Sequence, residues 1–554
     1  MVSEQIADLI GSHLPFTLTP EQREAALRLG AFIADPRSER CFALRGYAGT
    51  GKTSLIGALV KVLKEAEIPV VLLAPTGRAA KVFSLHAGAP AHTIHRIIYR
   101  QETFRGQDTP FQLAFNKQKH TVYIVDEASM IASGTGTMGD SLFGSGELLD
   151  DLIRYVYEGA GNRLLLVGDT AQLPPVGEDE SPALQRDVLL GYGLLVSGMQ
   201  LTQVVRQEEQ SAVLENATAL RTAIAAVQAE AATLHASAAG IPVALPPVTF
   251  GGEVERMPGG ELIEALYDAY GEYGTQGTIV VTRSNKQANI YNNGIRARIF
   301  DREEPLTRGD LVMAVKNNYY WLKPEPSQSP TSSPSPSEPP SVLRHPSPCR
   351  EGELPLKEAS EPSTAGAFSP SLQGEGWQGA AGSPDGEGLG ERLESPGAQA
   401  GFIANGDVAE VTHFRNEHEQ YGFRFADATL YFPDYDEEVE CRVMLSTLQS
   451  ESPSLTHEEQ SRLYEAVLAD YAHLPSKRER LKAVREDPYY NALQIKYAYA
   501  VTCHKAQGGQ WPRVFVDQGY IAPEAQDISH LRWLYTAFTR TTDKLFLINW
   551  RPSP

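Results

Sequence analysis

The chain has few cysteines, no long apolar run and no excess of basic residues. Its 554 residues include only 4 cysteines, none in a CxxC pair, which argues against a zinc site or a disulfide framework and favours a reducing cytoplasm. No segment approaches the roughly 18 consecutive apolar residues of a membrane span. Residues 1–10 carry Glu4 and Asp8 where an export signal would be basic. We therefore expect a cytoplasmic protein without a membrane partner.

The formal net charge is −20, with 69 acidic against 49 basic residues. This balance excludes a generally basic coat protein for nucleic acid, but it leaves room for binding in one locally basic groove.

The composition changes abruptly between residues 324 and 400. These 77 residues include 14 Pro, 14 Ser and 10 Gly, too few large apolar side chains for a core, so we expect a disordered insert. The segments on either side, 309–322 and 401–414, are both typical of strands. The sequence thus predicts a small β domain that the insert splits.

Elsewhere, short apolar runs alternate with helical stretches, which indicates an α/β fold with parallel sheets. One set of runs lies at 41–44, 70–73, 122–125 and 164–167, and a second at 278–281, 497–501, 514–516 and 545–548. Two such sheets are expected.

A phosphate-binding loop follows the first run. The segment GYAGTGKT matches G-x-x-x-x-G-K-[ST] between a predicted strand and a predicted helix. Its backbone amides would surround phosphate oxygens, Lys52 would reach the β- and γ-phosphates of ATP, and Thr53 would ligate Mg²⁺. The predicted ATP-binding residues here are Gly46, Tyr47, Ala48, Gly49, Thr50, Gly51, Lys52 and Thr53.

Acidic and amide side chains follow two further predicted strands. Asp126 is the expected Mg²⁺ ligand, and Glu127 is the expected base that activates water. After the strand at 164–167, Asp169 and Gln172 reach the same edge of the sheet, where Gln172 would sense the γ-phosphate. Arg206 and Arg540 are candidates for neutralising charge in the transition state. The predicted catalytic set is Lys52, Glu127, Gln172, Arg206 and Arg540.

In this order, the motifs resemble those of superfamily 1 DNA helicases, especially the Dda-like and RecD-like 5′-to-3′ branch. FTLTPEQREA (16–25) is similar to the adenine-recognising Q motif, with Gln22 as base reader. APTGRAAKVF (74–83), VDEASM (125–130), GDTAQLPPVG (168–177), LTQVVRQ (201–207), YAYAVTCHKAQGGQW (497–511) and YTAFTR (535–540) resemble further motifs of the family.

The resemblance implies two RecA-like motor domains with inserted modules. The expected ranges are 1–96 and 121–210 for domain 1A, 97–120 for a pin insertion, 211–300 and 488–554 for domain 2A, and 301–323 with 401–487 for an SH3-like 2B subdomain with a helical extension.

The resemblance also implies that single-stranded DNA crosses the tops of both sheets, through contacts to phosphates without reading of bases. The expected DNA contacts are Thr76, Arg78, Thr93, His95, Thr502, His504 and Lys505. In the pin segment, Phe104, Phe111 and Phe115 would either stack on the last base pair or fix the hairpin to the sheet.

The expected activity is that of an ATP- and Mg²⁺-dependent helicase that moves 5′ to 3′ on single strands and separates duplex DNA. Two alternatives are a remodelling helicase acting on RNA or DNA and a RecD-like motor subunit of a nuclease complex. A third, a binding protein without hydrolysis, disagrees with the complete set of catalytic residues. Expected partners are single-stranded DNA, its junctions with duplex, and repair or replication proteins; the chain is expected to act as a monomer.

Overall fold

The computed structural model describes residues 2–100, 112–133, 147–205, 211–234, 238, 241–318, 320–322, 403–434 and 436–550. The predicted disordered insert lies outside these ranges, as do Arg206, Phe104 and Phe111. Residues 1–324 and 399–554 form one unit, to which all the elements below belong. Within the described ranges, no helix combines the length and apolar character needed to cross a membrane.

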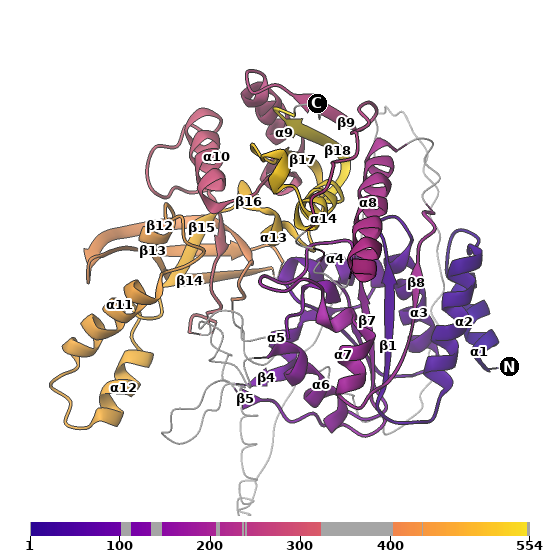
Figure 1. Ribbon diagram of the computed structural model, residues 1–554. Coiled ribbons are helices and arrows are strands. Elements are labelled where there is room, and N and C mark those ends of the chain that lie inside the picture. The colour runs from indigo at the N-terminus through magenta and orange to yellow at the C-terminus, as the bar shows by residue number, and fades with distance from the viewer. Residues whose placement is uncertain are drawn as a thin grey trace, which may run out of the picture. The chain divides into compact units, whose positions relative to one another are not determined.

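The N-terminal part of the chain forms a parallel six-stranded sheet (Figure 1). Helices cover both faces of this sheet, so its central strands are largely apolar, as in β6, where all four residues are buried. In spatial order the strands are β3 (Ala91–Thr93), β2 (Val70–Ala74), β6 (Val122–Val125), β7 (Arg163–Gly168), β1 (Arg40–Gly46) and β8 (Leu195–Leu201).

Helices pack on the two faces of this sheet and build a separate hydrophobic core on each. One core contains α1 (Val2–Ser12), α2 (Pro20–Ala34), α3 (Lys52–Glu65) and α4 (Gly77–Ala87). The other contains α5 (Ile94–Ile98), α6 (Leu148–Glu158), α7 (Arg186–Gly191) and the 3₁₀ turns η1 (Ala128–Met130) and η2 (Pro182–Leu184).

A second parallel sheet is assembled from distant parts of the chain. Its spatial order is β16 (Ala500–Thr502), β10 (Thr278–Thr282), β17 (Trp511–Asp517), β18 (Thr541–Ile548) and β9 (Val254–Met257). The magenta β9 lies beside the yellow β18 in Figure 1, although the sequence pattern did not indicate β9. The helices of this part are α8 (Ala212–Leu234), α9 (Leu262–Gly277), α10 (Asn285–Arg298), α13 (Cys503–Ala506) and α14 (Ile528–Phe538), with the 3₁₀ turn η5 (Pro523–Ala525).

The split β module is a closed barrel of β11 (Leu311–Ala314), β12 (Val408–Gln420), β13 (Phe423–Phe432), β14 (Glu437–Met444) and β15 (Leu493–Tyr497). The turn η4 (Leu445–Thr447) follows β14, and α11 (His457–Asp470) and α12 (Lys477–Arg485) form the extension. Strands β11 and β12, one on each side of the insert, pair antiparallel. The predicted fold, two RecA-like sheets with a split β module, is confirmed.

The chain enters the second sheet later than the expected boundary at residue 488. LQIKY, residues 493–497, closes the barrel as β15, and only Ala500–Thr502 joins the sheet as β16. The run YAYAV was predicted as one strand of the sheet, but it crosses from barrel to sheet at Ala498 and Tyr499. Both residues are buried in the hydrophobic core that the barrel and the second sheet share, so a continuous apolar run hides the crossing.

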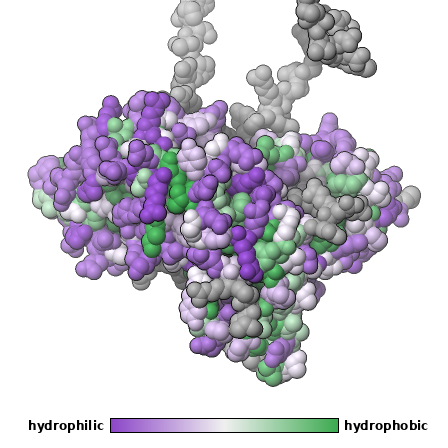
Figure 2. Space-filling model, turned by 90° about the horizontal axis from the view of Figure 1, so that it is seen from above, coloured by the Kyte–Doolittle hydropathy of each residue, from purple (hydrophilic) through white to green (hydrophobic). Residues whose placement is uncertain are grey.

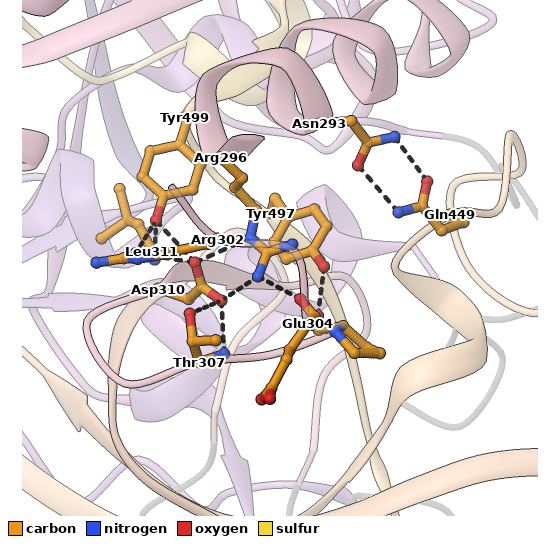
Figure 3. A network of polar contacts seen from close by, with 11 residues as sticks. Asn293, Arg296, Arg302, Glu304, Thr307, Asp310, Leu311, Gln449, Tyr497 and Tyr499 are labelled. Atoms are coloured by element: carbon orange, nitrogen blue, oxygen red, sulfur yellow. Dashed lines mark hydrogen bonds and ion pairs between the residues drawn. The ribbon is translucent and has the colours of Figure 1, made fainter. Parts of the chain in front are cut away.

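A buried ion network anchors the barrel to the second sheet (Figure 3). Asp310, which is fully buried, accepts hydrogen bonds from Arg296 Nε at 3.0 Å and Nη2 at 2.9 Å and from Arg302 Nη1 at 2.9 Å. Tyr499 donates to Asp310 at 3.1 Å and accepts from the backbone N–H of Leu311 at 3.0 Å. Burial alone would raise the pKa of Asp310, but the two arginines outweigh it and hold that pKa below its usual value.

The face of the molecule in Figure 2 is mainly hydrophilic, with smaller groups of hydrophobic residues between the polar ones. This surface agrees with the acidic composition, and scattered exposed apolar residues are ordinary for a folded protein.

Candidate nucleotide site and nucleic-acid track

The phosphate-binding loop connects β1 to α3, as its sequence predicts. Gly51 adopts a left-handed conformation with φ +80°, and a Cβ there would lie 2.5 Å from Gln22 Nε2, so only glycine fits. Lys52 Nζ donates to the carbonyls of Gly46 at 2.6 Å and Tyr47 at 2.8 Å. The ammonium group thus lies over the loop, where phosphate oxygens would replace the two carbonyls as its partners.

Gln22 is tied to protein groups at both ends of its side-chain amide. Its Oε1 accepts from Thr19 N at 3.1 Å in a capping box at the start of α2, and its Nε2 donates to Thr50 O at 3.1 Å. Gln22 is also buried, with 1% of its surface exposed. In this structure the residue fixes the loop, and its predicted contact with adenine stays a prediction.

The two adjacent acids follow β6 directly. Asp126 Oδ1 accepts from the backbone N–H of Glu127 at 2.9 Å, and Glu127 has a left-handed backbone with φ +51°. Such strain in a residue other than glycine is common at functional sites. Burial raises the pKa of Asp126, and the neighbouring charge of Glu127 raises it further, whereas Lys52 counteracts both. Two crowded carboxylates are a donor set that suits a divalent cation such as Mg²⁺.

The loop after β7 connects the first sheet to the second. Asp169 is buried and accepts at Oδ1 from Ala171 N at 2.9 Å. Its Oδ2 accepts from the hydroxyl of Tyr535 on α14 at 2.6 Å. The same hydroxyl accepts from the N–H of Ala48 in the phosphate loop at 2.7 Å. One phenol therefore joins the phosphate loop, the loop after β7 and α14.

Two further contacts strengthen this junction. The N–H of Leu173 donates to Thr536 Oγ1 at 2.9 Å, and Leu173 O accepts from Gln507 Nε2 at 2.8 Å. Ala171 and Leu173 are part of the core of the second sheet. The motifs around Tyr535, Thr536 and Gln507 were predicted, but these roles were not, because residue spacing does not show which side chain faces the other sheet.

Of the two candidate arginines, the structure describes Arg540. Arg540 is buried, and its Nε donates to Thr536 O at 2.9 Å and its Nη1 to Gly509 O at 3.3 Å. Its described partners thus belong to its own sheet, and it would have to turn to reach a γ-phosphate. Arg206 lies outside the described residues.

Two of the predicted DNA contacts lie at the start of α4, and one of them, Arg78, contacts the second sheet. Arg78 Cζ lies 4.1 Å from the ring centre of Trp511, and its Nη2 donates to Gln510 O at 3.3 Å. Gly508, with φ +73°, leaves no room for a side chain, because a Cβ would lie 2.7 Å from the Cβ of Ala79. Thr76 caps α4 by accepting from Ala79 N at 3.2 Å.

The remaining predicted contacts lie at comparable strand ends. Thr93 is buried and caps α5, and burial lowers the pKa of the adjacent His95, which keeps that imidazole neutral. On the second sheet, Thr502 precedes α13, His504 is exposed and Lys505 is half-buried. Hydroxyl and cationic groups at the ends of parallel strands suit phosphate contacts.

The predicted pin segment contains two short strands. β4 (Tyr99–Arg100) pairs antiparallel with β5 (Gln112–Leu113). Phe115 follows β5 and is 60% exposed; Phe104 and Phe111 lie outside the described residues. The barrel also contacts the first sheet's helices, since Lys81 Nζ on α4 lies 3.0 Å from Asp434 Oδ1 in the turn after β13.

Comparisons with known proteins agree with this arrangement. Residues 17–239 match the AAA domain family, and residues 497–548 match the UvrD-like helicase C-terminal domain. Over 185 residues the chain is 34% identical to the ATP-dependent RecD2 DNA helicase of Deinococcus radiodurans; this covers 33% of the chain and 22% of that protein. The chain thus matches about a fifth of the length of this curated relative.

Solved Pif1 helicases are also similar to the chain. The Bacteroides enzyme in complex with ADP-AlF3 and ssDNA has 14% identity and a TM-score of 0.39, with 97% of this chain and 93% of that chain covered. The Candida albicans enzyme has 15% identity and a TM-score of 0.36, with 97% and 95% covered.

The fold and the site define a P-loop nucleotide-binding protein with two RecA-like sheets. The two family matches, at 17–239 and 497–548, contain the ordered motifs of the sequence. Over these regions the chain is similar to RecD-like DNA helicases.

Proposed function

We propose that the protein is an ATP-driven DNA motor that moves 5′ to 3′ on a single strand and separates duplex. The observation that carries this proposal is the Tyr535 hydroxyl, which contacts the phosphate loop at Ala48 and the loop after β7 at Asp169. A nucleotide site at the junction of two sheets is suited to convert binding and hydrolysis into relative movement of those sheets.

In the proposed reaction, Lys52 and the loop amides bind the β- and γ-phosphates, and Thr53 and Asp126 hold Mg²⁺. The ion would neutralise phosphate charge. Glu127 accepts a proton from the attacking water, Gln172 senses the γ-phosphate, and Arg206 and Arg540 are the candidates for stabilising the transition state. Gln22 is the proposed adenine reader. To bind the base it would give up one of the two hydrogen bonds that its side-chain amide makes within the protein.

The single strand would cross both sheets over Thr76, Arg78, Thr93, His95, Thr502, His504 and Lys505. DNA as the substrate is supported by the RecD2 relative, which is named a DNA helicase, and the 5′-to-3′ direction is supported by the resemblance of the motifs to the 5′-to-3′ branch of superfamily 1. The pin hairpin, with Phe115, would meet the junction with duplex DNA. Repair, recombination or replication is the proposed setting, and the motor would act as a monomer.

Strand displacement on DNA and RNA duplexes with either a 5′ or a 3′ single-stranded tail tests this function. With ATP and Mg²⁺ we expect unwinding of DNA that has a 5′ tail. Unwinding that needs a 3′ tail would contradict the direction, and preference for RNA would favour the remodelling alternative. If unwinding appears only when a nuclease partner is added, the RecD-like subunit alternative holds.

Lys52→Ala is the matched inactive variant. Loss of this cation should lower DNA-stimulated ATP hydrolysis by about 10²-fold or more, while single-strand binding, measured by fluorescence anisotropy, stays near that of the unmodified protein. Unchanged hydrolysis would refute the assignment of the phosphate loop.

A further inference from the structure

A cavity of about 500 Å³ lies beside the nucleotide site. Among the described residues, its walls include Tyr47 of the phosphate loop and Asp169 and Gln172 from the loop after β7. Because Gln172 is the proposed sensor of the γ-phosphate, the cavity borders the position proposed for that phosphate. Its far walls come from η2, α7 and α8, and none of these elements takes part in the proposed reaction.

Four buried polar atoms around this cavity lack a hydrogen-bond partner among the described residues. They are Arg45 Nε, Ser129 Oγ, Gln172 Oε1 and Arg532 Nε, and all four residues line the cavity. Buried polar groups without partners cost free energy, so several on residues that line one cavity favour a polar ligand whose binding turns these side chains toward it.

The chemistry of these atoms favours one class of ligand. The two guanidinium groups and the serine hydroxyl donate hydrogen bonds, whereas Gln172 Oε1 accepts one. Inorganic phosphate at neutral pH carries oxygens that accept and at least one hydroxyl that donates, so it offers a partner to each kind of group. Asp169, Glu180 and Asp187 also line the cavity, and their charges oppose tight retention of an anion.

Hydrolysis would produce this ligand next to the cavity. The water oxygen bonds to the γ-phosphorus, the bond to the bridging oxygen of ADP breaks, and ADP, phosphate and a proton result. In an in-line displacement the water and the leaving ADP lie on opposite sides of the phosphorus, so phosphate is free to depart on the side away from ADP.

We propose that this cavity is the chamber through which inorganic phosphate leaves the nucleotide site, with Arg45, Ser129 and Arg532 as its binding groups. The assignment deepens the proposed function and rests on it. Weak, transient binding fits a product that must leave in each cycle while ADP is still held by the phosphate loop.

Product inhibition tests the chamber. ATP hydrolysis is measured with increasing sodium phosphate at constant ionic strength for the unmodified protein, Arg532→Gln and Ser129→Ala. We expect the inhibition constant for phosphate to rise about tenfold or more in Arg532→Gln and about fivefold in Ser129→Ala, as for loss of a charged and of a neutral hydrogen bond. The KM for ATP should stay unchanged, because neither side chain belongs to the phosphate loop.

Arg163→Gln is the matched control. Its Nε is also buried without a described partner, but Arg163 does not line the cavity, so its inhibition constant should match that of the unmodified protein. Equal inhibition constants for phosphate in all four proteins would overturn the assignment of the chamber. It would also be overturned if the constant rose as much in Arg163→Gln as in the two cavity variants. If Arg532→Gln does not fold, Ser129→Ala decides alone.

Equilibrium dialysis with radiolabelled phosphate, in the presence of ADP and Mg²⁺, separates this inference from the proposed function. Phosphate binding that weakens in both cavity variants supports the chamber even if hydrolysis is absent, in which case the proposed function fails. Hydrolysis without any phosphate binding, or with binding equal in all variants, overturns the chamber and leaves the proposed function standing.

Discussion

Lys505 combines a proposed DNA contact with an unusual pKa. Burial and, to a smaller extent, the charge of nearby Lys496 together lower its pKa to about 8. The ammonium group is therefore charged below pH 8 and loses its proton above it, where it no longer attracts a phosphate. We expect affinity for single-stranded DNA to fall as the pH rises from 7 to 9, by at most about tenfold per pH unit, as measured by fluorescence anisotropy.

Lys505→Arg is the control for this pH dependence, because a guanidinium group stays charged throughout that range. Its affinity should change less between pH 7 and 9 than that of the unmodified protein. Lys496 has a pKa lowered by burial to about 8 as well, but it is buried and donates to Ser450 O. Equal slopes for both proteins would exclude Lys505 as the titrating contact.

Single residues show where the sequence is informative and where it is not. The phosphate loop and Glu127 were identifiable because their chemistry fixes residue types at short spacing. The Tyr535 contact with Ala48 spans 487 positions, and no local pattern encodes it. Gln22 was identifiable as a motif residue. Its two side-chain hydrogen bonds, to Thr19 and Thr50, were not, because they depend on how closely α2 approaches the phosphate loop.

At the scale of elements, α14 is held against the phosphate loop by one hydroxyl. Tyr535→Phe keeps the buried ring but removes its bonds to Ala48 and Asp169. We expect the ratio of DNA-stimulated to basal ATP hydrolysis to fall by about fivefold or more, as for loss of a typical coupling free energy between sites. The KM for ATP should change little, because the phenol is not expected to contact nucleotide.

Tyr431→Phe is the matched control, since its exposed hydroxyl donates to Asp436 at 2.9 Å on the barrel surface. It should keep the full ratio. If Tyr535→Phe also keeps it, the link between α14 and the phosphate loop has no part in coupling.

The junction of α10 with the barrel depends on a buried carboxylate. Asp310→Asn would leave Arg296 and Arg302 without their counter-charge, so we expect the free energy of unfolding to fall by about 3–5 kcal/mol. Urea denaturation measures the change. Glu417→Gln removes a surface partner of Arg424 and should cost at most about 1 kcal/mol. Similar losses in the two variants would contradict the anchoring role of Asp310.

For the whole molecule, the sequence predicts the sheets better than their boundaries. Continuous apolar runs mark central strands such as β6 and β10, which are buried along their whole length. The short β9 sequence, VERM, carries two charged residues and lies at the edge of the sheet among the described strands, beside β18, so its pattern is too weak to indicate a strand. The passage from barrel to sheet at Ala498 lies within one apolar run, and only tertiary packing determines it.

The insert joins two strands that are already neighbours. Residues Leu311–Met313 of β11 pair with Val408–Glu410 of β12, and beyond the strands Asn318 and Ile403 exchange two backbone hydrogen bonds of 2.8 Å. The two segments that flank the insert are thus hydrogen-bonded to each other. A short loop could connect them, because hairpin turns need only a few residues.

Replacing residues 324–400 by a short Gly/Ser linker should therefore preserve the fold and the unwinding rate. The net charge would rise from −20 to about −13, because the removed residues contain 11 acids and 4 bases. Weaker repulsion of DNA phosphates would then make single-strand binding equal or slightly tighter at low salt, and this gain should vanish as salt screens the surface charge. Thermal unfolding and strand displacement at two salt concentrations measure both effects. A shortened protein that melts earlier or no longer unwinds would show that the insert is part of the working structure.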